Sequence, residues 1–279
     1  MSSDLLAVAV DAARAAAELV RATSQGEITV AATKSSDVDV VTEADRASER
    51  LIRERIAGSR PDDAFLGEEG DDVPGSTGVR WVIDPIDGTV NFLYGLPQYA
   101  VSIAAEVDGV VVAGVVLNIA TGVEFTAYAD QDGVVRSRRD GEPIRVRATV
   151  PLGQRLVSTG FSYDAHLRGL QARALVELIP QVRDIRRLGS CALDLCHVAE
   201  GTLDGYLEEG VNLWDHAAGG LVAQGAGATV EVTTGVGGRR LVLCAPADGF
   251  DELRTAVAAS GYLATPAPEE TWTTPVDRE

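Results

Sequence analysis

Apolar residues recur at helical spacing near the start of the chain. The stretch from Leu5 to Val20 is interrupted by Asp11, Arg14 and Glu18, at intervals suited to an amphipathic helix. This pattern predicts a helix over about residues 4–23. The stretch lacks a basic leading region, which argues against a signal peptide. No later apolar run reaches the roughly 20 residues that a membrane-spanning helix needs, so the pattern indicates a soluble protein.

A second helix and two short strands follow. Thr42-Glu43-Ala44-Asp45 has the spacing of a capping box, so a helix is expected to start after Thr42, with Asp45 as the acidic member of the cap. Short buried strands are predicted at 64–66 and 80–83. The first runs into Glu68-Glu69 and the second into Asp84, although Glu69 can be only a solvent-exposed neighbour. Carboxylates at the ends of adjacent strands can converge in space.

The middle of the chain is rich in strand patterns. Asp108-Gly109 joins two apolar runs and is a strong signal for a two-residue hairpin, which implies a large antiparallel sheet. Helices then alternate with strands, so the second half is expected to be α/β. The predicted strands lie at 99–107, 110–117, 124–128, 155–159, near 184, at 203–208 and as a pair through 243; the predicted helices lie at 166–180, 190–201, 215–224 and 248–259.

These elements predict one domain over residues 1–264, with an N-terminal half of about 1–150 and a C-terminal half of about 151–264. The Pro- and Thr-rich segment 265–279 is expected to be a tail. Gly225-Ala226-Gly227 lacks the third glycine of a dinucleotide-binding fingerprint and is interpreted as a helix-ending turn.

Charge narrows the class of ligand. The chain has 24 basic and 42 acidic side chains and a net charge of −18, which opposes binding to nucleic acid or to an anionic membrane. Any anionic substrate therefore needs bridging cations. The local cluster of Arg136, Arg138, Arg139 and Arg145 has no interleaved aromatic residues and is interpreted as a solvated face. Lys34 is the only lysine.

Cysteine and histidine spacing excludes several kinds of site. Cys191, Cys196 and Cys244 form an odd, sparse set without a CxxC pair, which favours a reducing, cytoplasmic compartment and argues against a zinc ribbon. The three histidines lack HExxH spacing, and neither a GxSxG elbow nor a P-loop occurs. Zinc, serine-hydrolase and nucleotide-cofactor chemistry are therefore not indicated.

The strongest chemical signal is the segment Trp81-Val82-Ile83-Asp84-Pro85-Ile86-Asp87-Gly88-Thr89-Val90-Asn91-Phe92. We expect the strand to break at Pro85, between two carboxylates, and Thr89 to begin a helical turn whose free N–H groups can bind an anion. Mg²⁺ prefers oxygen ligands, and two such ions can activate a water and neutralise a phosphoryl leaving group. An Asp-Pro turn followed by an Asp-Gly cap is the structural alternative.

Four ordered motifs resemble the inositol monophosphatase family over about residues 5–260. They are the Asp84-to-Thr89 string, the segment from Lys34 to Thr42, Gly67-Glu68-Glu69, and Leu213-Trp214-Asp215. The resemblance implies an α/β (α+β) fold, a layered α-β-α-β-α sandwich of the inositol monophosphatase or fructose bisphosphatase type. It also implies a homodimer and sensitivity to Li⁺.

The resemblance further implies two to three Mg²⁺ ions. Glu68, Asp84 and the Ile86 carbonyl would hold a first ion, and Asp84, Asp87 and Asp215 a second; a weaker third ion is associated with Glu68. Glu68 and Thr89 would orient the attacking water, with Asp87 among the catalytic residues. Without the resemblance, the N-cap of the following helix is the structural alternative for Asp215.

The substrate implied is a phosphate monoester, hydrolysed by direct attack of water. Its phosphate would be bound by the backbone of Gly88 and Thr89. Its alcohol would be contacted by Asp87, Gly189, Ser190, Cys191, Glu208 and Asp215. Cys191 is interpreted as a packed small residue rather than a reactive thiol.

Some assignments stay open at this stage. In relatives the segment with Lys34 and Asp39 forms a flap over the metals, while a solvated loop lysine is the alternative. The substrate could be inositol monophosphate, or a related sugar, histidinol or 3′-phosphonucleotide ester. A regulatory protein of the transcription machinery is a hypothesis of a different class.

Overall fold

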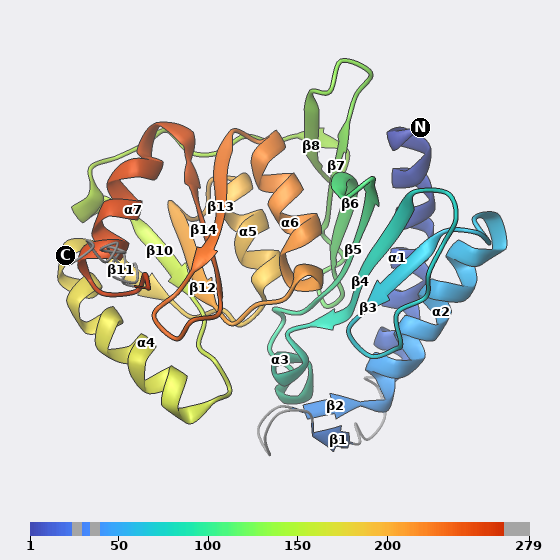
Figure 1. Cartoon of the computed structure of the whole chain (residues 1–279), viewed down its shortest axis with the longest axis horizontal. Helices are drawn as coiled ribbons and strands as arrows, with labels where there is room; N and C mark the ends of the chain where they lie inside the picture. The colour runs from blue at the N-terminus through green and yellow to red at the C-terminus, as the bar shows by residue number, and fades with distance from the viewer. Residues whose placement is uncertain (24–29, 34–39, 265–279) are drawn as a thin grey trace, which may run out of the picture.

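Two β-sheets with helices on both faces of each form the body of the protein (Figure 1). The structure is a computed structural model and describes residues 1–23, 30–33 and 40–264. The predicted flap residues Lys34 and Asp39 and the predicted tail 265–279 lie outside the described residues. Within that part of the chain, no helix is long and apolar enough to cross a membrane.

The first sheet has seven strands in the order β3-β4-β5-β6-β7-β8-β9. Strands β3 and β4 are parallel and the remaining neighbours are antiparallel, so the large antiparallel sheet that the hairpin signal implied is present, with a parallel pair at one edge that was not predicted. The predicted hairpin is confirmed: Asp108 and Gly109 have φ values of 51° and 82°, which suit the turn between β5 and β6. The strands are β3 Ala64–Gly67, β4 Val79–Asp87, β5 Ala100–Val107, β6 Val110–Asn118, β7 Glu124–Ala129, β8 Val135–Arg139 and β9 Glu142–Pro143.

Helices α1 (Ser2–Thr23) and α2 (Glu43–Ser59) cover the outer face of this sheet. Helix α1 buries a stripe of alanines from Ala9 to Ala17, and these small side chains let it lie close to α2 and the sheet. The capping box at the start of α2 is confirmed, because the Thr42 side chain accepts from the Asp45 N–H while Asp45 accepts from the Thr42 N–H. A short pair of strands, β1 Val30–Thr33 and β2 Val40–Thr42, precedes α2.

The second sheet has five strands in the order β11-β10-β12-β14-β13. Strands β11, β10 and β12 run parallel, and β12, β14 and β13 are antiparallel neighbours. This mixed pattern follows from the helical crossovers in the second half and the closing hairpin. The strands are β10 Leu156–Thr159, β11 Asp184–Arg186, β12 Gly205–Glu209, β13 Ala228–Thr234 and β14 Arg240–Pro246.

Helices α5 (Cys191–Ala199) and α6 (Leu213–Gly225) lie between the two sheets, and their buried residues form a core with both. Helices α4 (Ala165–Leu178) and α7 (Phe250–Ala259) cover the outer face of the second sheet. The succession of layers is therefore helix, sheet, helix, sheet, helix, as Figure 1 shows from right to left. This confirms the predicted α/β sandwich. Helix α3 (Thr89–Tyr94) lies at the end of β4.

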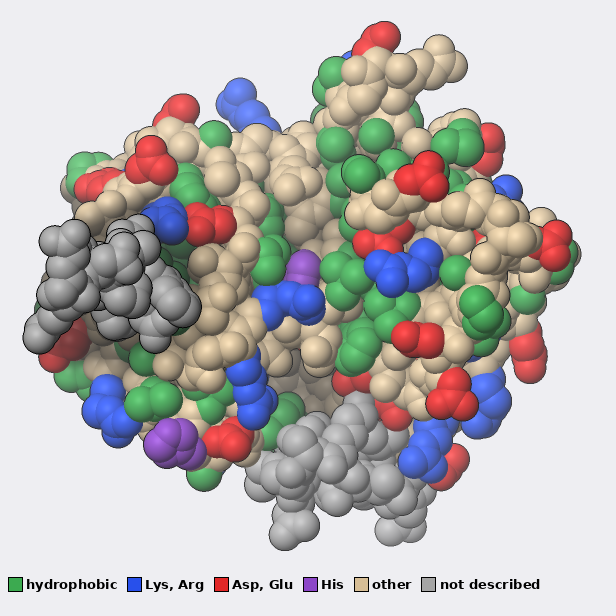
Figure 2. All heavy atoms as spheres, in the orientation of Figure 1, with side chains coloured by type: hydrophobic (Ala, Val, Ile, Leu, Met, Phe, Trp, Pro, Cys, Tyr) green, Lys and Arg blue, Asp and Glu red, His purple; other side chains and the backbone are tan. Residues whose placement is uncertain are grey.

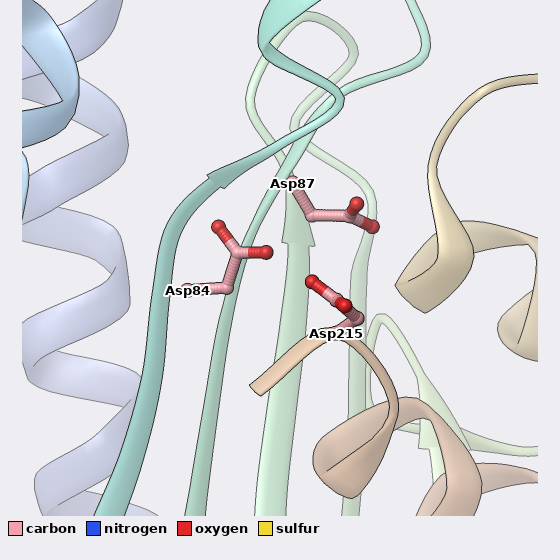
Figure 3. A group of neighbouring side chains, drawn as sticks. All are labelled: Asp84, Asp87 and Asp215. Atoms are coloured by element: carbon pink, nitrogen blue, oxygen red, sulfur yellow. The ribbon is translucent and has the colours of Figure 1, made fainter. Parts of the chain in front are cut away.

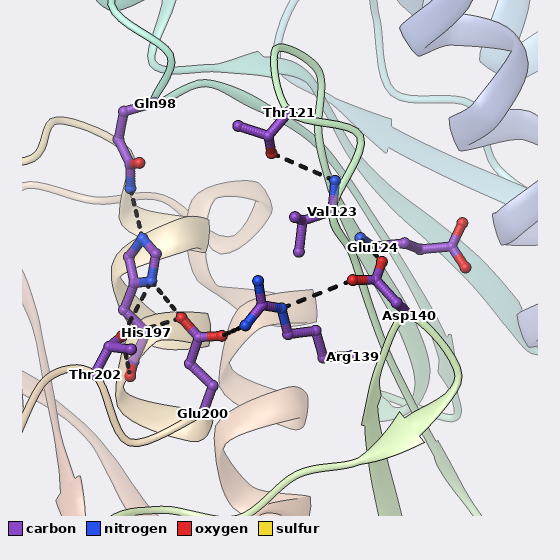
Figure 4. Close-up of polar contacts among 9 residues, drawn as sticks. All are labelled: Gln98, Thr121, Val123, Glu124, Arg139, Asp140, His197, Glu200 and Thr202. Atoms are coloured by element: carbon purple, nitrogen blue, oxygen red, sulfur yellow. Dashed lines mark hydrogen bonds and ion pairs between the residues drawn. The ribbon is translucent and has the colours of Figure 1, made fainter.

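A polar network joins the C-terminal end of α5 to the first sheet (Figure 4). Arg139 on β8 forms a 2.9 Å ion pair with Glu200, whose side chain is largely buried. Glu200 also lies 2.9 Å from Nδ1 of His197, and the other ring nitrogen of His197 contacts Gln98. Arg139 is thus part of a bridge between halves of the chain, and because it is still exposed it lies with Arg136, Arg138 and Arg145 on the predicted solvated face.

The predicted boundaries beside the carboxylates were wrong at two elements. Strand β4 does not end at Pro85 but continues to Asp87, and its register with β5 shifts between Asp84 and Asp87. Pro85 has no N–H, and the next N–H, that of Ile86, donates to the Asp84 carboxylate at 3.1 Å instead of to the ladder. Helix α6 begins at Leu213 rather than Asp215, because Asn212 is its N-cap.

Candidate active site

Three carboxylates from the two halves of the chain meet beside α3 (Figure 3). Asp84 and Asp87 lie at the irregular end of β4, and Asp215 lies in the first turn of α6. One oxygen from each lies within 4.8 Å of the others. The fold therefore brings together the sequence-predicted residues Asp84, Asp87 and Asp215, although Asp215 lies 128 positions after Asp87 in the sequence.

The cluster is crowded with like charge. Burial, followed by the charge of Glu68, raises the pKa of Asp84 and of Asp215 well above the usual range. Burial also raises the pKa of Asp87 to about 6, against hydrogen bonds that favour its charged form. A divalent cation would relieve this repulsion, and hard oxygen donors are the ligands that Mg²⁺ prefers. The residues present fit a metal centre.

Glu68 is held at the rim of this centre. Its N–H donates to the Ile83 carbonyl at 3.2 Å, and its side chain lines the same cavity as Asp84. Glu68 is outside the tight group of three carboxylates, but its charge is the largest that acts on Asp84. The site thus has a dense centre and a fourth carboxylate at its edge.

A buried residue that the sequence did not single out fixes the loop of Glu68. Glu49 on α2 is 2% exposed and accepts hydrogen bonds from the N–H groups of Glu69 (2.8 Å) and Gly70 (3.0 Å). Arg53 pairs with the same carboxylate at 2.8 Å. A Cβ at Gly67 would lie 2.3 Å from it, so glycine is required for this close approach. Glu49 is a positioning residue for the Glu68 loop.

Thr89 begins α3 with its hydroxyl between two acceptors. The hydroxyl lies 3.0 Å from Oδ1 of Asp45 and 3.0 Å from the Ile86 carbonyl. Asp45 is 1% exposed, and its other oxygen accepts from the Thr42 N–H at 2.8 Å. The interpretation of Asp45 as a cap is therefore confirmed but incomplete, because the same carboxylate also orients Thr89. The hydroxyl proton has an acceptor, which leaves an oxygen lone pair to accept from a water.

Gly88 makes the turn that places Thr89. Its φ is 93°, a left-handed conformation, and a Cβ there would lie 2.8 Å from the Gln98 carbonyl. The residues that follow form the first turn of α3, whose N–H groups have no acceptor within the helix. Gly88 and Thr89 line the same cavity as the carboxylate cluster, so free N–H groups at the start of α3 can donate to an anion bound there.

Asp87 connects the carboxylate cluster to the start of α5. Its Oδ2 accepts from the Ser190 hydroxyl at 2.5 Å and from the Ala192 N–H at 2.7 Å. Ser190 is the N-cap of α5 and also accepts from the Leu193 N–H. The predicted substrate loop Gly189-Ser190-Cys191 is thus anchored at the carboxylate cluster. Burial raises the pKa of the Cys191 thiol well above its usual range, so Cys191 is no reactive thiolate.

Glu208 also lines the cavity, near the end of β12. It accepts from the Tyr206 hydroxyl at 2.9 Å, and burial raises the pKa of its carboxyl while the nearby Arg187 opposes this. A Cβ at Gly160 would lie 1.9 Å from the Glu208 carboxyl carbon, so Gly160 leaves room for this side chain. The cavity of about 600 Å³ has the size of a small-molecule site.

The alternative that Asp215 is a helix N-cap is wrong. Asn212 is the N-cap, and Asp215 is three residues further, where one of its oxygens accepts from the Asn212 N–H at 2.5 Å. Its other oxygen stays available to the cluster. The residues that sequence reasoning missed are Asp45 as a partner of Thr89, Glu49 at the Glu68 loop, and Arg187, Arg239 and Arg240 in the cavity wall.

The raised pKa values predict how cations stabilise the fold. Without metal, Asp84, Asp87 and Asp215 retain protons in the folded state at pH values where the unfolded chain has released them. Stability of the metal-free protein should therefore fall as the pH rises from about 4 through about 6 and beyond, and cation binding should strengthen over the same range. Calorimetry with EDTA or Mg²⁺ at several pH values should show a Mg²⁺-induced rise in Tm that grows with pH, to roughly 5 °C at 100 times Kd. An equal rise at about pH 5 and about pH 8 would contradict a metal site on these carboxylates.

Replacing Glu49 by glutamine should weaken the metal centre from a distance. The amide keeps one acceptor oxygen, so its NH₂ group would face only one of the two N–H groups of Glu69 and Gly70, and the variant would lose the charge that pairs with Arg53. We expect a loss of about 1–3 kcal/mol of stability and a roughly tenfold rise in the Mg²⁺ concentration for half-maximal effect. A Mg²⁺ titration followed by Tm measures this. Glu54→Gln, at an exposed position on the same helix, is the control and should change neither quantity. An unchanged Mg²⁺ titration in Glu49→Gln would show that the loop holds Glu68 without Glu49.

Comparisons with known proteins agree with this geometry. Residues 1–271 match the model of the inositol monophosphatase family. A relative named inositol-1-monophosphatase SuhB, from Mycobacterium tuberculosis, is 48% identical over 231 residues, which are 80% of each chain. The solved structure of Mycobacterium tuberculosis SuhB has a TM-score of 0.78 at 40% identity and covers 94% of this chain and 98% of its own. A relative named Nus factor SuhB, from Pasteurella multocida, is 39% identical over 228 residues, 81% of this chain and 84% of its own. The match to the family model, the sequence identity to these relatives and the shared layered fold all agree, so the chain belongs to the inositol monophosphatase family.

Proposed function

We propose that the protein is a Mg²⁺-dependent phosphomonoesterase that hydrolyses inositol monophosphate to inositol and inorganic phosphate. The observation that carries the proposal is the group of Asp84, Asp87 and Asp215 within 4.8 Å, beside a threonine whose hydroxyl is oriented by a buried carboxylate. Carboxylates alone would suit many metal proteins. An oriented hydroxyl and the free N–H groups of a helix start beside them suit attack of water on a phosphate.

The metal ligands proposed are those of the predicted set. Glu68, Asp84 and the Ile86 carbonyl would hold one Mg²⁺, and Asp84, Asp87 and Asp215 a second, with a third ion near Glu68. The ions, when bound, supply positive charge that polarises the phosphoryl group. Burial, together with the charges of Glu68, Asp87 and Asp215, raises the pKa of Asp84, and this crowding of like charge supports the assignment.

The water is proposed to lie between Thr89 and Glu68. The Thr89 hydroxyl donates toward Asp45, so its oxygen accepts a hydrogen bond from the water and turns the water's lone pair toward phosphorus. In hydrolysis the water oxygen forms the new P–O bond and the ester P–O bond breaks. One water is consumed, and its two protons end on the alcohol and the phosphate. No covalent phosphoenzyme is required.

The two ends of the substrate are proposed to contact different walls. The N–H groups of Gly88 and Thr89 would donate to phosphate oxygens and stabilise charge that grows there. Asp87, Asp215, Glu208 and the Gly189-Ser190-Cys191 loop would bind the hydroxyls of the alcohol. The anchoring of that loop on Asp87 supports this division, because one carboxylate then connects the metal centre and the alcohol side.

Three properties expected of the family belong to this proposal: a homodimer, inhibition by Li⁺, and work in the cytoplasm. The three cysteines are free and buried in the structure, which agrees with a reducing compartment. A sedimentation measurement and a Li⁺ titration of turnover would test the first two.

Phosphate release from a substrate panel tests the function. The panel holds inositol 1-phosphate, histidinol phosphate, fructose 1,6-bisphosphate and phosphoadenosine phosphate, each with Mg²⁺ or with EDTA. We expect turnover of inositol 1-phosphate that needs Mg²⁺. Activity that survives EDTA would overturn the metal mechanism, and a higher kcat/KM for another ester would assign the enzyme to the related sugar, histidinol or 3′-phosphonucleotide phosphatases.

A regulatory binding role with the transcription machinery is the second candidate. A relative that is 39% identical carries the name Nus factor SuhB, which favours this alternative. It would be supported if every ester fails while affinity capture recovers a stoichiometric complex with RNA polymerase or its factors. The metal and water residues are all present in this chain, whereas binding alone would not require them.

A further inference from the structure

A second cavity lies between α2 and the loop that carries Glu68. Its volume is about 220 Å³, and in the described part of the chain it shares no lining residue with the active-site cavity. Figure 2 shows basic and acidic side chains next to one another at the lower right of the molecule, where α2 lies in Figure 1. Three arginines, two carboxylates and a glycine line the cavity: Arg46, Arg50, Arg53, Glu49, Glu69 and Gly70. Because pockets for larger ligands begin at roughly 300 Å³, this cavity suits a small ion.

The three arginines lie on one face of α2. Positions 46, 50 and 53 are spaced by four and three residues, so the side chains are neighbours on the helix surface. Like charges at this spacing repel one another and destabilise a helix. Arg46 has a partner in Glu43, but at 3.8 Å and with both side chains exposed to water the pair contributes little. An anion bound beside the arginines would remove the repulsion between them.

The donors of these arginines are only partly used. Arg50 is exposed and forms no side-chain hydrogen bond or ion pair within the described residues. Arg53 donates from Nε to Glu49 at 2.8 Å and from Nη1 to the Asp71 carbonyl at 3.0 Å. Its Nη2 is buried and has no acceptor among residues 1–23, 30–33 and 40–264. A buried donor without an acceptor costs free energy, which a ligand with oxygen acceptors would recover.

The carboxylates in the lining do not meet this demand. Glu49 already accepts from the N–H groups of Glu69 and Gly70 and from Arg53. Glu69 also lines the cavity, so two negative charges stand against the three positive charges of the arginines. In a chain with a net charge of −18, this cavity therefore has a local excess of positive charge.

Arg53 connects the cavity to the loop of Glu68. A Cβ at Gly67 would lie 2.7 Å from Nη2 of Arg53, and a Cβ at Gly70 would lie 3.1 Å from it, so this nitrogen is tucked against the loop on both sides of Glu68. The hydrogen bond from Nη1 to the Asp71 carbonyl adds a further contact to the same segment. A change in how Arg53 is held is therefore transmitted to the loop of a proposed metal ligand.

We propose that the cavity of Arg46, Arg50 and Arg53 is an effector site for a small dianion, a phosphate or a dicarboxylate, whose binding strengthens Mg²⁺ binding at the metal centre. A guanidinium presents a planar fork of N–H donors that fits the oxygens of either group. The dianion supplies an acceptor to the arginines and thereby restrains the Glu68 loop. By linkage, Mg²⁺ strengthens the binding of the dianion by the same factor. The proposal rests on the metal centre proposed above but on no particular ester.

Calorimetric titration with inorganic phosphate and with succinate tests the site. The protein is freed of metal by dialysis, so that no cation in the active site can hold either anion. We expect a Kd of about 0.1–1 mM for at least one of them, and binding at least about tenfold weaker in Arg46→Gln/Arg50→Gln. The anion that binds more tightly identifies the effector as a phosphate or a carboxylate.

A control variant removes the same charge elsewhere. Arg173→Gln/Arg183→Gln changes two exposed positions outside both cavities and should bind the anions as the wild type does. Binding that Arg46→Gln/Arg50→Gln retains would overturn the proposal, as would the absence of binding by both anions up to about 10 mM.

A Mg²⁺ titration followed by Tm tests the coupling. With the anion at about ten times its Kd, the free Mg²⁺ concentration for half-maximal effect should fall about fivefold or more. Arg46→Gln/Arg50→Gln should keep the titration measured without anion and lose this fall. Glu49→Gln should still bind the anion and lose most of the fall, because its amide no longer ties Arg53 to the loop. A titration that the anion leaves unchanged in the wild type would contradict the proposal.

Neither measurement uses an ester, so the outcome is separate from that of the proposed function. If no ester of the panel is hydrolysed, the phosphatase proposal fails, while the two titrations still decide whether the effector site exists. If inositol 1-phosphate is hydrolysed but the Arg46 and Arg50 side chains change neither titration, the effector site fails and the phosphatase proposal stands.

Discussion

Asp84→Asn should leave the protein folded and lower Mg²⁺-dependent phosphate release by about a thousandfold. Asp84 is proposed to contact both principal ions, so the amide removes one negative charge from each. Metal stabilisation of a transition state is worth several kcal/mol, and each 1.36 kcal/mol is a factor of about ten in rate. The amide oxygen can still accept the hydrogen bond from the Ile86 N–H, so the irregular end of β4 should be kept. Steady-state phosphate release measures the loss.

Stability distinguishes this variant from a merely misfolded one. Because burial and the charges of Glu68, Asp87 and Asp215 all raise the pKa of Asp84, removal of its charge should raise the Tm of the metal-free protein at neutral pH and abolish most of the Mg²⁺-induced rise. Asp108→Asn, at an exposed turn where asparagine tolerates the positive φ, should behave like the wild type in both respects. Wild-type turnover in Asp84→Asn would show that the site lies elsewhere. Asp87→Asn is less informative, because Asp87 also anchors Ser190 and Ala192.

Local sequence motifs predicted most helices, strands and turns, because each motif forms its hydrogen bonds among its own few residues. The hydrogen bonds of the capping box at Thr42 and the turn at Asp108-Gly109 each lie within about four residues, so they depend little on distant parts of the chain. Pro85 shows the limit of such a rule. Proline removes one N–H, but whether a strand ends there depends on the neighbouring strand, and β5 accommodates the irregularity with a register shift.

The sequence motifs predicted the three clustered carboxylates, but they did not predict the buried residues that hold the neighbouring groups in place. Asp45 contacts Thr89 across 44 positions of sequence, and Glu49 reaches the Glu69 N–H across 20. Both residues lie on one face of α2. The sequence pattern of this helix does not show which groups its buried polar side chains contact. The partner of a buried carboxylate is decided by how α2 packs on β4, which no local pattern contains. The same reason hides Arg239, whose place in the cavity follows from the Glu209 contact with its loop.

Removal of the Thr89 hydroxyl should leave Mg²⁺ binding intact, but the proposed attacking water would no longer be oriented. In Thr89→Val the shape is kept, and neither Asp45 nor the water has the hydroxyl as a partner. We expect kcat to fall by roughly 10²- to 10⁴-fold, the usual contribution of a positioned proton-handling group, with a nearly unchanged Mg²⁺-induced rise in Tm. Asp45→Asn should show a similar fall, and the double variant should be little worse than either single one, because residues that act as a unit are not additive.

Thr89→Ser is the matched control, since it keeps the hydroxyl and removes only a methyl group. It should retain most of the turnover, although the freer serine side chain makes some loss in kcat reasonable. Equal activity in the serine and valine variants would mean that the hydroxyl does not orient the water. Full additivity of Thr89→Val and Asp45→Asn would mean that Asp45 acts on catalysis by a route other than Thr89. In that case its role would be limited to the Thr42 cap and the position of α2.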